Sequence, residues 1–542
     1  MNIRIGVLIG IVLSVACSSS SEEVDLRSFE KFSQVWLKDK NMISTLNRFN
    51  CGYDSKGGQI GVYGSSSGDG SSRSNAIIID STGAFNRMAQ DTDNYDKYFI
   101  LTEDLDFKGA IIQPIADISN PFTGTFEGFG HTLKNFTIDS AADANNRTAM
   151  FRYCEGATIF GVNIENAVLE SDTPNDSRSY SSLLVAENDY QSRILYCNVN
   201  GSLKHTATQT ATGGYDLVGL VAGSNHGQIE GCRVSGRLEA YSSADSYCSF
   251  GGLVGRQTGP LSTAGTGSCL NCTSDVDIYI NGELDAGSNY VGGFAGSIVQ
   301  TNSGANANYI ENCHSTGNVF VNQVATTASN SYLFGGFIGS VTSKVINCSA
   351  ACDSMEITCA GTYAADTVRC RIGGFVGGGL TLSGQSGDID SCYCDVNLKI
   401  GYTDSALPNV GGFVGRFEYA ITNCYSSGTI YDLTADGIAL GFRYGGFAGK
   451  LALTSCDVDD CYCVIDTLYT GTNVAGFTVS EAASPNVDGT FWNSTTSGIT
   501  ASETSSTAKT TAEMTTSSAT TFTAWGPPWA IVAGQYPKLL WE

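Results

Sequence analysis

Closely spaced carboxylates are the side chains of this sequence best suited to chemistry. They occur in three short segments: Asp275-Val276-Asp277, Asp388-Ile389-Asp390 and Asp457-Val458-Asp459-Asp460. Side chains two residues apart share one face of a strand, so each segment places a pair of carboxylates side by side. Such pairs can supply the acid and base of sugar cleavage, although most acidic pairs are solvated surface groups or loose cation sites. The segments therefore indicate an alternative function, a polysaccharide-degrading lyase or glycoside hydrolase.

Other catalytic arrangements have little support. The four histidines are scattered, and the sequence places no Ser or Cys beside any of them: His131, His205, His226 and His314. Cys269-x-x-Cys272 has the spacing of a zinc-ligand pair, but it lacks a second pair or a nearby histidine. We therefore expect no catalytic residue, no metal and no cofactor, and a protein that is not an enzyme.

The N-terminus indicates lipidation. Arg4 precedes a mostly apolar run over residues 5–15, which is too short to span a bilayer, and Ala16-Cys17 follows. This pattern resembles a bacterial lipoprotein signal, although Leu13 lies one place early and Ser14 takes its position. The resemblance implies that Cys17 is acylated and that its acyl chains hold the protein in a membrane. We expect a surface-exposed protein anchored by lipid in the bacterial cell envelope, at the outer membrane.

The strands that position these residues are predicted from a repeat in the sequence. A Gly-Gly-Phe-x-Gly phrase, with Leu in place of Phe in one copy, supplies the predicted structural positions Gly252, Gly293, Phe294, Gly336, Phe337, Gly374, Phe375, Gly412, Phe413, Gly446 and Phe447. A cysteine recurs at a second position, at Cys197, Cys232, Cys272, Cys313, Cys348, Cys392, Cys424 and Cys461. Central apolar residues of successive copies lie about 30 to 43 residues apart, a period typical of solenoids and propellers.

Each copy predicts two strands. The Gly-Gly-Phe phrase forms a short strand whose Phe points inward, while its glycines permit tight bends. The second strand carries the cysteine, and alternation places Thr422 and Cys424, or Ile346 and Cys348, on the same face. With 64 Gly, 9 Pro and 42% hydrophobic residues, the composition suits an all-β protein. The predicted fold is a single parallel β-helix of about ten irregular coils, with caps over both ends.

Four segments follow along the chain. They are the signal with its acylated Cys at 1–17, a tether with a short helix at 18–75, the β-helix at 76–490, and a Thr/Ser-rich segment with an aromatic cap at 491–542. Early in the β-helix we predict strands over 76–80 and 98–101 and a helix over 81–90, N-capped by Ser81 or Thr82. The tail aromatics are dense enough to cover a core end, or alternatively to form a sugar-binding platform: Trp525, Trp529, Tyr536 and Trp541.

The chain has 19 cysteines. At repeat-equivalent positions they would stack inside the solenoid, where a free thiol acts as a small apolar filler. In an oxidising location, cysteines outside this ladder could instead form disulfides between coils, because the coil spacing suits the required Cα separation. The candidates are Cys269, Cys352, Cys359 and Cys370.

Charge and resemblance together bound the function. The net charge of −24 argues against a nucleic-acid partner, since no basic stripe is visible. The string over 121–138, the Gly-Gly-Phe-x-Gly and Asn-Cys repeats and the tail segments Phe491-Trp492-Asn493 and Gln535-Tyr536-Pro537 resemble the GLUG-motif proteins, extracellular β-solenoids of bacterial adhesin type. The sequence departs from that pattern in having Phe more often than Leu after the glycine pair and in carrying additional cysteines. The resemblance implies an adhesin or binding scaffold whose partners are the membrane, through the lipid, and a glycan or a host or cell-surface protein.

Overall fold

A computed structural model describes residues 68–542, except for 141–145, 175–177, 209–213, 243–246, 260–266, 284–287, 301–307, 325–330, 361–369, 380–386, 404–407, 434–442, 453–455, 468–473, 480–485, 503–504 and 517. The predicted lipidation site Cys17 and the predicted tether helix lie outside the described residues. None of the helices in the described part of the chain is long and apolar enough to cross a bilayer.

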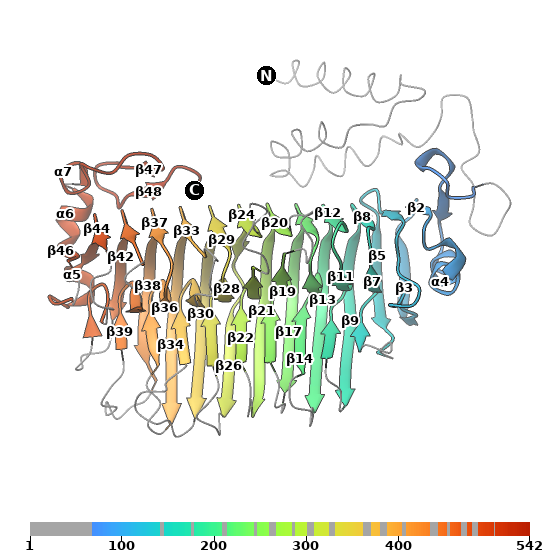
Figure 1. Ribbon diagram of the computed structural model, residues 1–542, viewed down its shortest axis with the longest axis horizontal. Coiled ribbons are helices and arrows are strands. Elements are labelled where there is room, and N and C mark those ends of the chain that lie inside the picture. The colour runs from blue at the N-terminus through green and yellow to red at the C-terminus, as the bar shows by residue number, and fades with distance from the viewer. Residues whose placement is uncertain are drawn as a thin grey trace, which may run out of the picture.

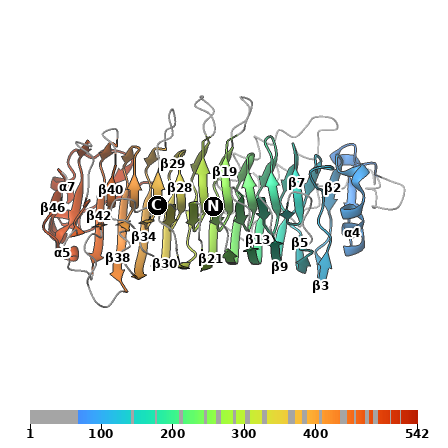
Figure 2. The same ribbon diagram turned by 60° about the horizontal axis from the view of Figure 1, so that its bottom comes forward.

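The chain winds into an elongated stack of coils, with four parallel sheets along its length (Figure 1). We label the four sheets A to D and give their strands below. Each complete coil passes through them in the order D, C, A and B, and its strands pair with the equivalent strands of the next coil. The turned view in Figure 2 shows the same regular progression from the N-terminal to the C-terminal coils. The predicted all-β parallel solenoid is confirmed.

Two sheets contain the strands that flank the recurring cysteine. Sheet A consists of β1 (Ile77–Ile79), β2 (Tyr98–Leu101), β4 (Thr125–Glu127), β8 (Thr158–Phe160), β12 (Arg193–Leu195), β16 (Gln228–Glu230), β20 (Ser268–Leu270), β24 (Tyr309–Glu311), β29 (Lys344–Ile346), β33 (Ile389–Asp390), β37 (Ile421–Thr422), β41 (Val458–Asp459) and β44 (Val487–Asp488). Sheet B consists of β3 (Leu105–Ile112), β5 (Thr132–Ile138), β9 (Asn163–Pro174), β13 (Asn198–Thr208), β17 (Arg233–Ser242), β21 (Thr273–Glu283), β25 (His314–Ser315), β26 (Val319–Val324), β30 (Ser349–Ala360), β34 (Tyr393–Thr403), β38 (Tyr425–Asp432), β42 (Tyr462–Thr467), β45 (Phe491–Asn493) and β46 (Thr507–Lys509).

The other two sheets contain the strands that flank the glycine pair. Sheet C consists of β7 (Phe151–Cys154), β11 (Val185–Asn188), β15 (Ala222–Asn225), β19 (Val254–Thr258), β23 (Ala295–Val299), β28 (Ile338–Val341), β32 (Val376–Gly379), β36 (Val414–Phe417) and β40 (Ala448–Leu451). Sheet D consists of β6 (Arg147–Thr148), β10 (Arg178–Ser181), β14 (Tyr215–Gly219), β18 (Tyr247–Gly251), β22 (Ser288–Gly292), β27 (Ser331–Gly335), β31 (Cys370–Gly373), β35 (Asn409–Gly411), β39 (Arg443–Gly445) and β43 (Val474–Ala475).

The Gly-Gly-Phe phrase forms a corner, whereas the sequence predicted one short strand. In one coil, Gly411 ends β35, Gly412 and Phe413 make the bend, and Val414 begins β36. A Cβ on Gly411 would lie 2.0 Å from the Val414 carbonyl oxygen, and one on Gly412 would lie 2.1 Å from the Gly446 carbonyl oxygen of the next coil. Only glycine fits where two backbones approach this closely.

The phenylalanines of these corners point into the core and form a continuous stack. Their ring centroids lie 4.7–4.9 Å apart from one coil to the next, and each side chain is fully buried: Phe294, Phe337, Phe375, Phe413, Phe447 and Phe477. This spacing matches the strand spacing of a sheet, so the same ring contact repeats in each coil from Phe294 to Phe477.

The cysteine also lies at a corner, and the predicted alternation around it is wrong. Asn423 adopts a left-handed backbone conformation with φ of 54°, and the equivalent Asn347 has φ of 52°. This turn between sheets A and B breaks the period of two, so Ile421 and Cys424 both face the core while Thr422 is half-buried. Asparagine tolerates this conformation better than most residues, which explains the Asn-Cys pairing in the sequence.

The corner cysteines form an internal ladder of free thiols. The Cys424 thiol donates to the Thr422 carbonyl oxygen over 3.0 Å, and the Cys424 N–H donates to Cys461 Sγ over 3.4 Å. Burial raises the pKa of Cys272 and of Cys313, which keeps these two thiols protonated. Of the disulfide candidates, Cys269 and Cys352 are free and buried, Cys370 is buried, and the Cys359 side chain is outside the described residues.

The N-terminal end of the core is covered by helix α4 (Thr82–Gln90), between 3₁₀ turns η1 (Arg73–Asn75) and η2 (Thr92–Asn94). Ser81 caps this helix by accepting a hydrogen bond from the Ala84 N–H over 3.2 Å. Phe85 packs edge-on against Phe107 and Phe126, with ring centroids 5.4 and 6.4 Å away. The predicted strands and helix of this region therefore form the first cap.

The C-terminal end of the core is covered by Trp492 and the chain around helix α5 (Ser494–Ser497), and sheet B continues beyond the predicted boundary at 490 to Lys509. The Trp492 indole donates to the Ile499 carbonyl oxygen over 3.0 Å. The tail beyond it contains α6 (Thr511–Thr515), α7 (Ser518–Thr521) and the antiparallel pair β47 (Trp529–Ala530) and β48 (Lys538–Leu539).

The tail aromatics cover a flank of the stack, not the core end that the sequence indicated. They pack on the outer face of sheet B, against a row that we call the covered row: Tyr393, Tyr425, Tyr462 and Phe491. The Tyr462 hydroxyl donates to the Pro537 carbonyl oxygen over 2.6 Å, and the Trp541 indole donates to the Ser391 carbonyl oxygen over 3.0 Å. Figure 1 shows this tail folded back over the C-terminal coils.

Candidate functional site: an open aromatic row on sheet B

The long strands of sheet B send alternate side chains to the core and to the outer surface. In β21, Val276, Ile278 and Ile280 are buried, whereas Tyr279 and Asn281 face outward. Because the strands are parallel and in register, outward residues of neighbouring coils line up into rows. The surface chemistry of sheet B is therefore set row by row.

One such set of outward side chains is aromatic and accessible. We call it the open aromatic row: Tyr279 and its register partner Phe320, together with Tyr241, which lies two positions further along the neighbouring strand, opposite Asn281. The Tyr279 and Phe320 rings stack with centroids 4.8 Å apart, and Tyr241 is 47% exposed. The Arg237 guanidinium lies 3.7 Å from the centre of the Tyr279 ring and fixes it by a cation–π contact.

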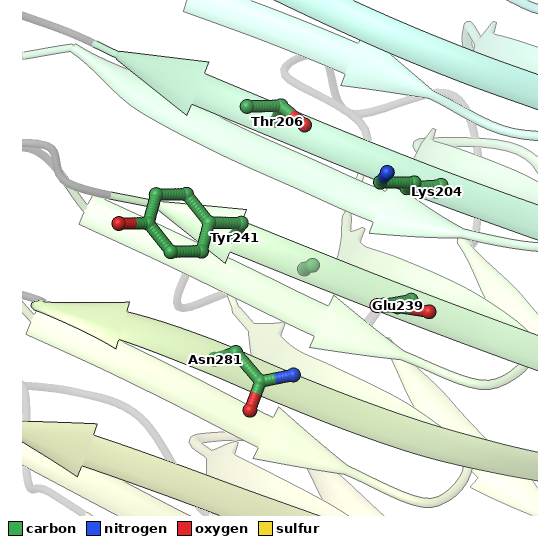
Figure 3. A pocket seen from close by; sticks show the side chains of 6 residues that line it. Lys204, Thr206, Glu239, Tyr241 and Asn281 are labelled. Atoms are coloured by element: carbon green, nitrogen blue, oxygen red, sulfur yellow. The ribbon is translucent and has the colours of Figure 1, made fainter.

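A shallow depression lies beside this row and is lined by polar groups from three strands. Lys204 and Glu239 are register partners, as are Thr206 and Tyr241. Figure 3 shows that Asn281 of β21 lies next to Tyr241, so that a phenol, an amide, an ammonium and a carboxylate border one area. An aromatic face can cover the apolar face of a sugar ring, while such polar groups can bond its hydroxyls.

The predicted carboxylate pairs do face outward, but most of them serve the stack. Asp390 accepts hydrogen bonds from Thr422 and Asn423 of the next coil, at 3.1 and 3.0 Å. Asp275 accepts one from Thr316 over 3.0 Å, and Asp277 accepts one from the Asn318 N–H over 3.0 Å. These bonds connect neighbouring coils, which is a structural use of the carboxylates.

The last carboxylate cluster has an altered titration. Burial, and then the negative charges of Asp459 and Asp488, raise the pKa of Asp460 to about 6. Asp460 stands where other coils have the corner asparagine, with φ of 50°. Within the described residues, no three His, Cys, Asp or Glu side chains gather closely enough to hold a metal ion.

The structure also brings together a Ser, a His and an Asp that the sequence could not associate. His205 Nδ1 lies 3.3 Å from Ser181 Oγ, and His205 Nε2 lies 3.7 Å from Asp216 Oδ1. All three side chains are fully buried inside the coils, so no substrate reaches them. We assign them to the interior packing of the first coils.

The open aromatic row was missed by sequence reasoning, which concentrated on the repeated glycines and cysteines. The available signal was the outward phase of the long strands after each cysteine: Tyr241, Tyr279 and Phe320 each occupy an outward position. The predicted structural residues, from Gly252 to Phe447, lie at the corner between sheets D and C and are buried there.

Comparison with known proteins identifies the repeat. The model of the GLUG motif matches residues 407–431, which include the Gly411 to Phe413 corner, the Asn423-Cys424 corner and strand β38. No curated protein and no solved structure matches the chain. The match and the stacked parallel sheets agree with the resemblance inferred from the sequence, and the chain is a parallel β-helix repeat protein that carries the GLUG motif.

Proposed function

We propose that this protein is a non-catalytic surface scaffold that binds a glycan on the outer face of sheet B. The observation that carries the proposal is the open aromatic row, an accessible aromatic surface beside Lys204, Glu239 and Asn281. Such a surface combines apolar contact area with directional polar groups, the pairing that sugar recognition requires. The rigid sheet holds these side chains in place, which reduces the entropy lost on binding.

The test is a glycan-array screen of the protein from Ser18 onward, followed by the double variant Tyr241→Ala/Tyr279→Ala. We expect the array signal to fall at least about tenfold, since stacked aromatic contacts and their hydrogen bonds each contribute of the order of 1 kcal/mol. The matched control is Tyr431→Ala, which removes a 42% exposed tyrosine at the same register position three coils beyond Phe320, separated from it by Glu356 and Lys399. Equal binding by the double variant and the control would reject the site.

We also propose that Cys17 carries the lipid that holds the scaffold on the cell surface. The support is the signal-like sequence from Arg4 to Cys17. Stable attachment would depend on the acyl chains, so Cys17→Ser should release the protein from the membrane fraction. A wild type and a Cys17→Ser variant that fractionate alike would remove the anchor from the proposal, and protection of the wild type from external protease would remove only its surface position.

Polysaccharide cleavage remains the competing function for the carboxylates. The bonds of Asp390 to Thr422 and Asn423 favour a structural role for this residue. Depolymerisation of a uronate polymer by the purified protein, abolished in Asp388→Asn/Asp390→Asn but retained in Tyr241→Ala/Tyr279→Ala, would overturn the non-catalytic scaffold.

A further inference from the structure

Sheets D and C meet at a corner where their outer faces approach each other. The Tyr247 hydroxyl of sheet D lies 2.7 Å from Ser297 Oγ of sheet C, and Ser249 Oγ lies 2.8 Å from the same oxygen. Outward side chains of two sheets therefore converge along this edge. A ligand lying there would contact both sheets at once.

In the first coils, this corner neutralises its own charge. Arg147 of β6 forms an ion pair with Glu187 of β11, which joins sheet D to sheet C. The Arg147 guanidinium also lies over the rings of Tyr153 and Tyr180, at 4.9 and 5.1 Å from their centres. At this end, the positive charge of Arg147 is therefore balanced by Glu187.

In the last coils, the equivalent positions of both sheets carry cations. We call this group the basic corner: Arg371 and Arg443 from sheet D, and Arg416 and Lys450 from sheet C. Arg416 and Lys450 are register partners in adjacent coils, and Arg443 is one coil beyond Asn409, the partner of Arg371. A Cβ on Gly378 would lie 3.2 Å from Arg371 Cδ, so the glycine leaves room for this long side chain.

The charges of the basic corner are incompletely balanced. Arg416 pairs with Glu418 over 2.8 Å, yet Arg416 Nε is buried without a hydrogen-bond partner among the described residues. In the same described part, neither Arg443 nor Lys450 forms an ion pair with a carboxylate. Burial, and then the positive charges of Arg443, Arg416 and Arg371, lower the pKa of Lys450, with Glu418 acting in the opposite direction.

We propose that the basic corner binds the sulfate or carboxylate groups of an acidic polysaccharide. Guanidinium groups present forked donors that match the oxygens of such anions, and Lys450 adds a point charge beside them. Arg443, Arg416 and Lys450 are partly exposed and therefore accessible from solvent. The protein has a net charge of −24 and therefore repels polyanions over most of its surface. Binding would depend on the locally positive charge of the basic corner. The site lies on other sheets than the open aromatic row and does not depend on it.

The experiment measures binding of dextran sulfate, polygalacturonate and uncharged dextran to the protein by titration calorimetry. We expect one or both charged polymers to bind at the basic corner and uncharged dextran not to bind there. The affinity for the charged polymer should fall as NaCl is added. Arg443→Gln/Lys450→Gln should weaken that binding about tenfold or more, because charge-assisted hydrogen bonds are lost. The control Lys134→Gln/Lys344→Gln removes two positive charges from other sheets and should bind like the wild type.

Several outcomes overturn the proposal. They are absence of polyanion binding by the wild type, an equal effect of the two double variants, and binding to phosphatidylglycerol vesicles without binding to either polymer. The unfolding temperature of Arg443→Gln/Lys450→Gln is compared with that of the wild type. If the double variant unfolds at a lower temperature, polyanion binding by the single variant Lys450→Gln decides the test. Tyr241→Ala/Tyr279→Ala should still bind the polyanion, so failure of the open aromatic row and failure of the basic corner are distinguishable.

Discussion

Sheet B presents two aromatic rows that differ in whether the chain covers them. In the covered row, Tyr462 is 2% exposed and Tyr425 is 8% exposed, because the tail packs on them. In the open aromatic row, Tyr241 is 47% exposed and the tail does not reach it. The rows occupy different positions along the strands, but both lie on in-register parallel strands and have similar ring spacings, 4.8 Å for Tyr279 and Phe320 and 4.9 Å for Tyr425 and Tyr462, so ring spacing does not distinguish them. The comparison teaches that the tail decides which part of the flank is structural and which is available to a partner.

The largest effect should follow from truncating the centre of the covered row. Tyr462→Ala removes a fully packed ring and its hydrogen bond to the Pro537 carbonyl oxygen, which should lower the free energy of unfolding by about 3–5 kcal/mol. Denaturant unfolding measures this loss, and limited proteolysis should detect release of the tail. Tyr462→Phe, which keeps the ring, should cost only about 1 kcal/mol. Equal losses for both variants would show that ring packing does not hold the tail.

A smaller effect is expected at the far end of the tail. Trp541→Ala removes a hydrogen bond to the Ser391 carbonyl oxygen and ring contacts with Tyr393 and His314, which should cost about 1–3 kcal/mol. Burial lowers the pKa of His314, so uncovering it should return that pKa toward its ordinary value. An NMR titration of His314 measures this rise. An unchanged pKa would show that groups other than Trp541 bury His314.

In the open aromatic row, stability and binding should separate. Tyr279→Ala should change the free energy of unfolding by no more than about 1 kcal/mol, since its ring is half-buried at the surface. Glycan binding on the array should nevertheless fall strongly. A loss of stability as large as that of Tyr462→Ala would contradict the comparison, because both rows would then be structural.

The smallest effect should appear next to the covered row, at Asp460. Its pKa is raised to about 6, so the folded state binds the proton more tightly than the unfolded state. The favourable contribution is complete at about pH 4 and below and is lost as the pH rises through about 6. Asp460→Asn should therefore stabilise the protein at pH 7–8 by up to about 1 kcal/mol after allowance for solvent screening, and have little effect near pH 4. Thermal unfolding at both pH values checks the sign, and stabilisation confined to acid would contradict it.

The sequence was sufficient for the class of fold because the same corner chemistry recurs in it. Repeats of the Gly412-Phe413 and Asn423-Cys424 phrases marked many of the coils, and Ser81 marked the first cap. The path through each corner was not predictable by alternation, since the left-handed residue before the cysteine interrupts the period of two. A strand-face argument therefore placed Thr422 inside where Ile421 belongs.

The candidate site required the three-dimensional structure. Tyr241, Tyr279 and Phe320 are far apart in the sequence, and only the register of β17, β21 and β26 brings them together. The same holds for Trp541, which reaches Ser391 across 150 residues. Aromatic density predicted burial of the tail, but sequence contains no signal for which surface it would cover. The proximity of Arg416 and Lys450 could not be predicted from the sequence either, because they are brought together by the register of adjacent strands and not by a fixed spacing along the chain.

The cysteine corners have a consequence for how the gene can change. Corner cysteines of successive coils lie 32 to 44 residues apart in the sequence. Despite this variation the contact is the same, because the backbone N–H of Cys348 donates to Cys392 Sγ as that of Cys392 donates to Cys424 Sγ. Each coil contacts chiefly its neighbours, so the stack can be treated as a chain of exchangeable units. Unequal recombination between two codons of the Asn-Cys corner would delete or duplicate one coil and rejoin the chain in frame at equivalent backbone positions. The length of the rod, and the distance between the basic corner and the open aromatic row, could thus vary among descendants of one gene without new folding information.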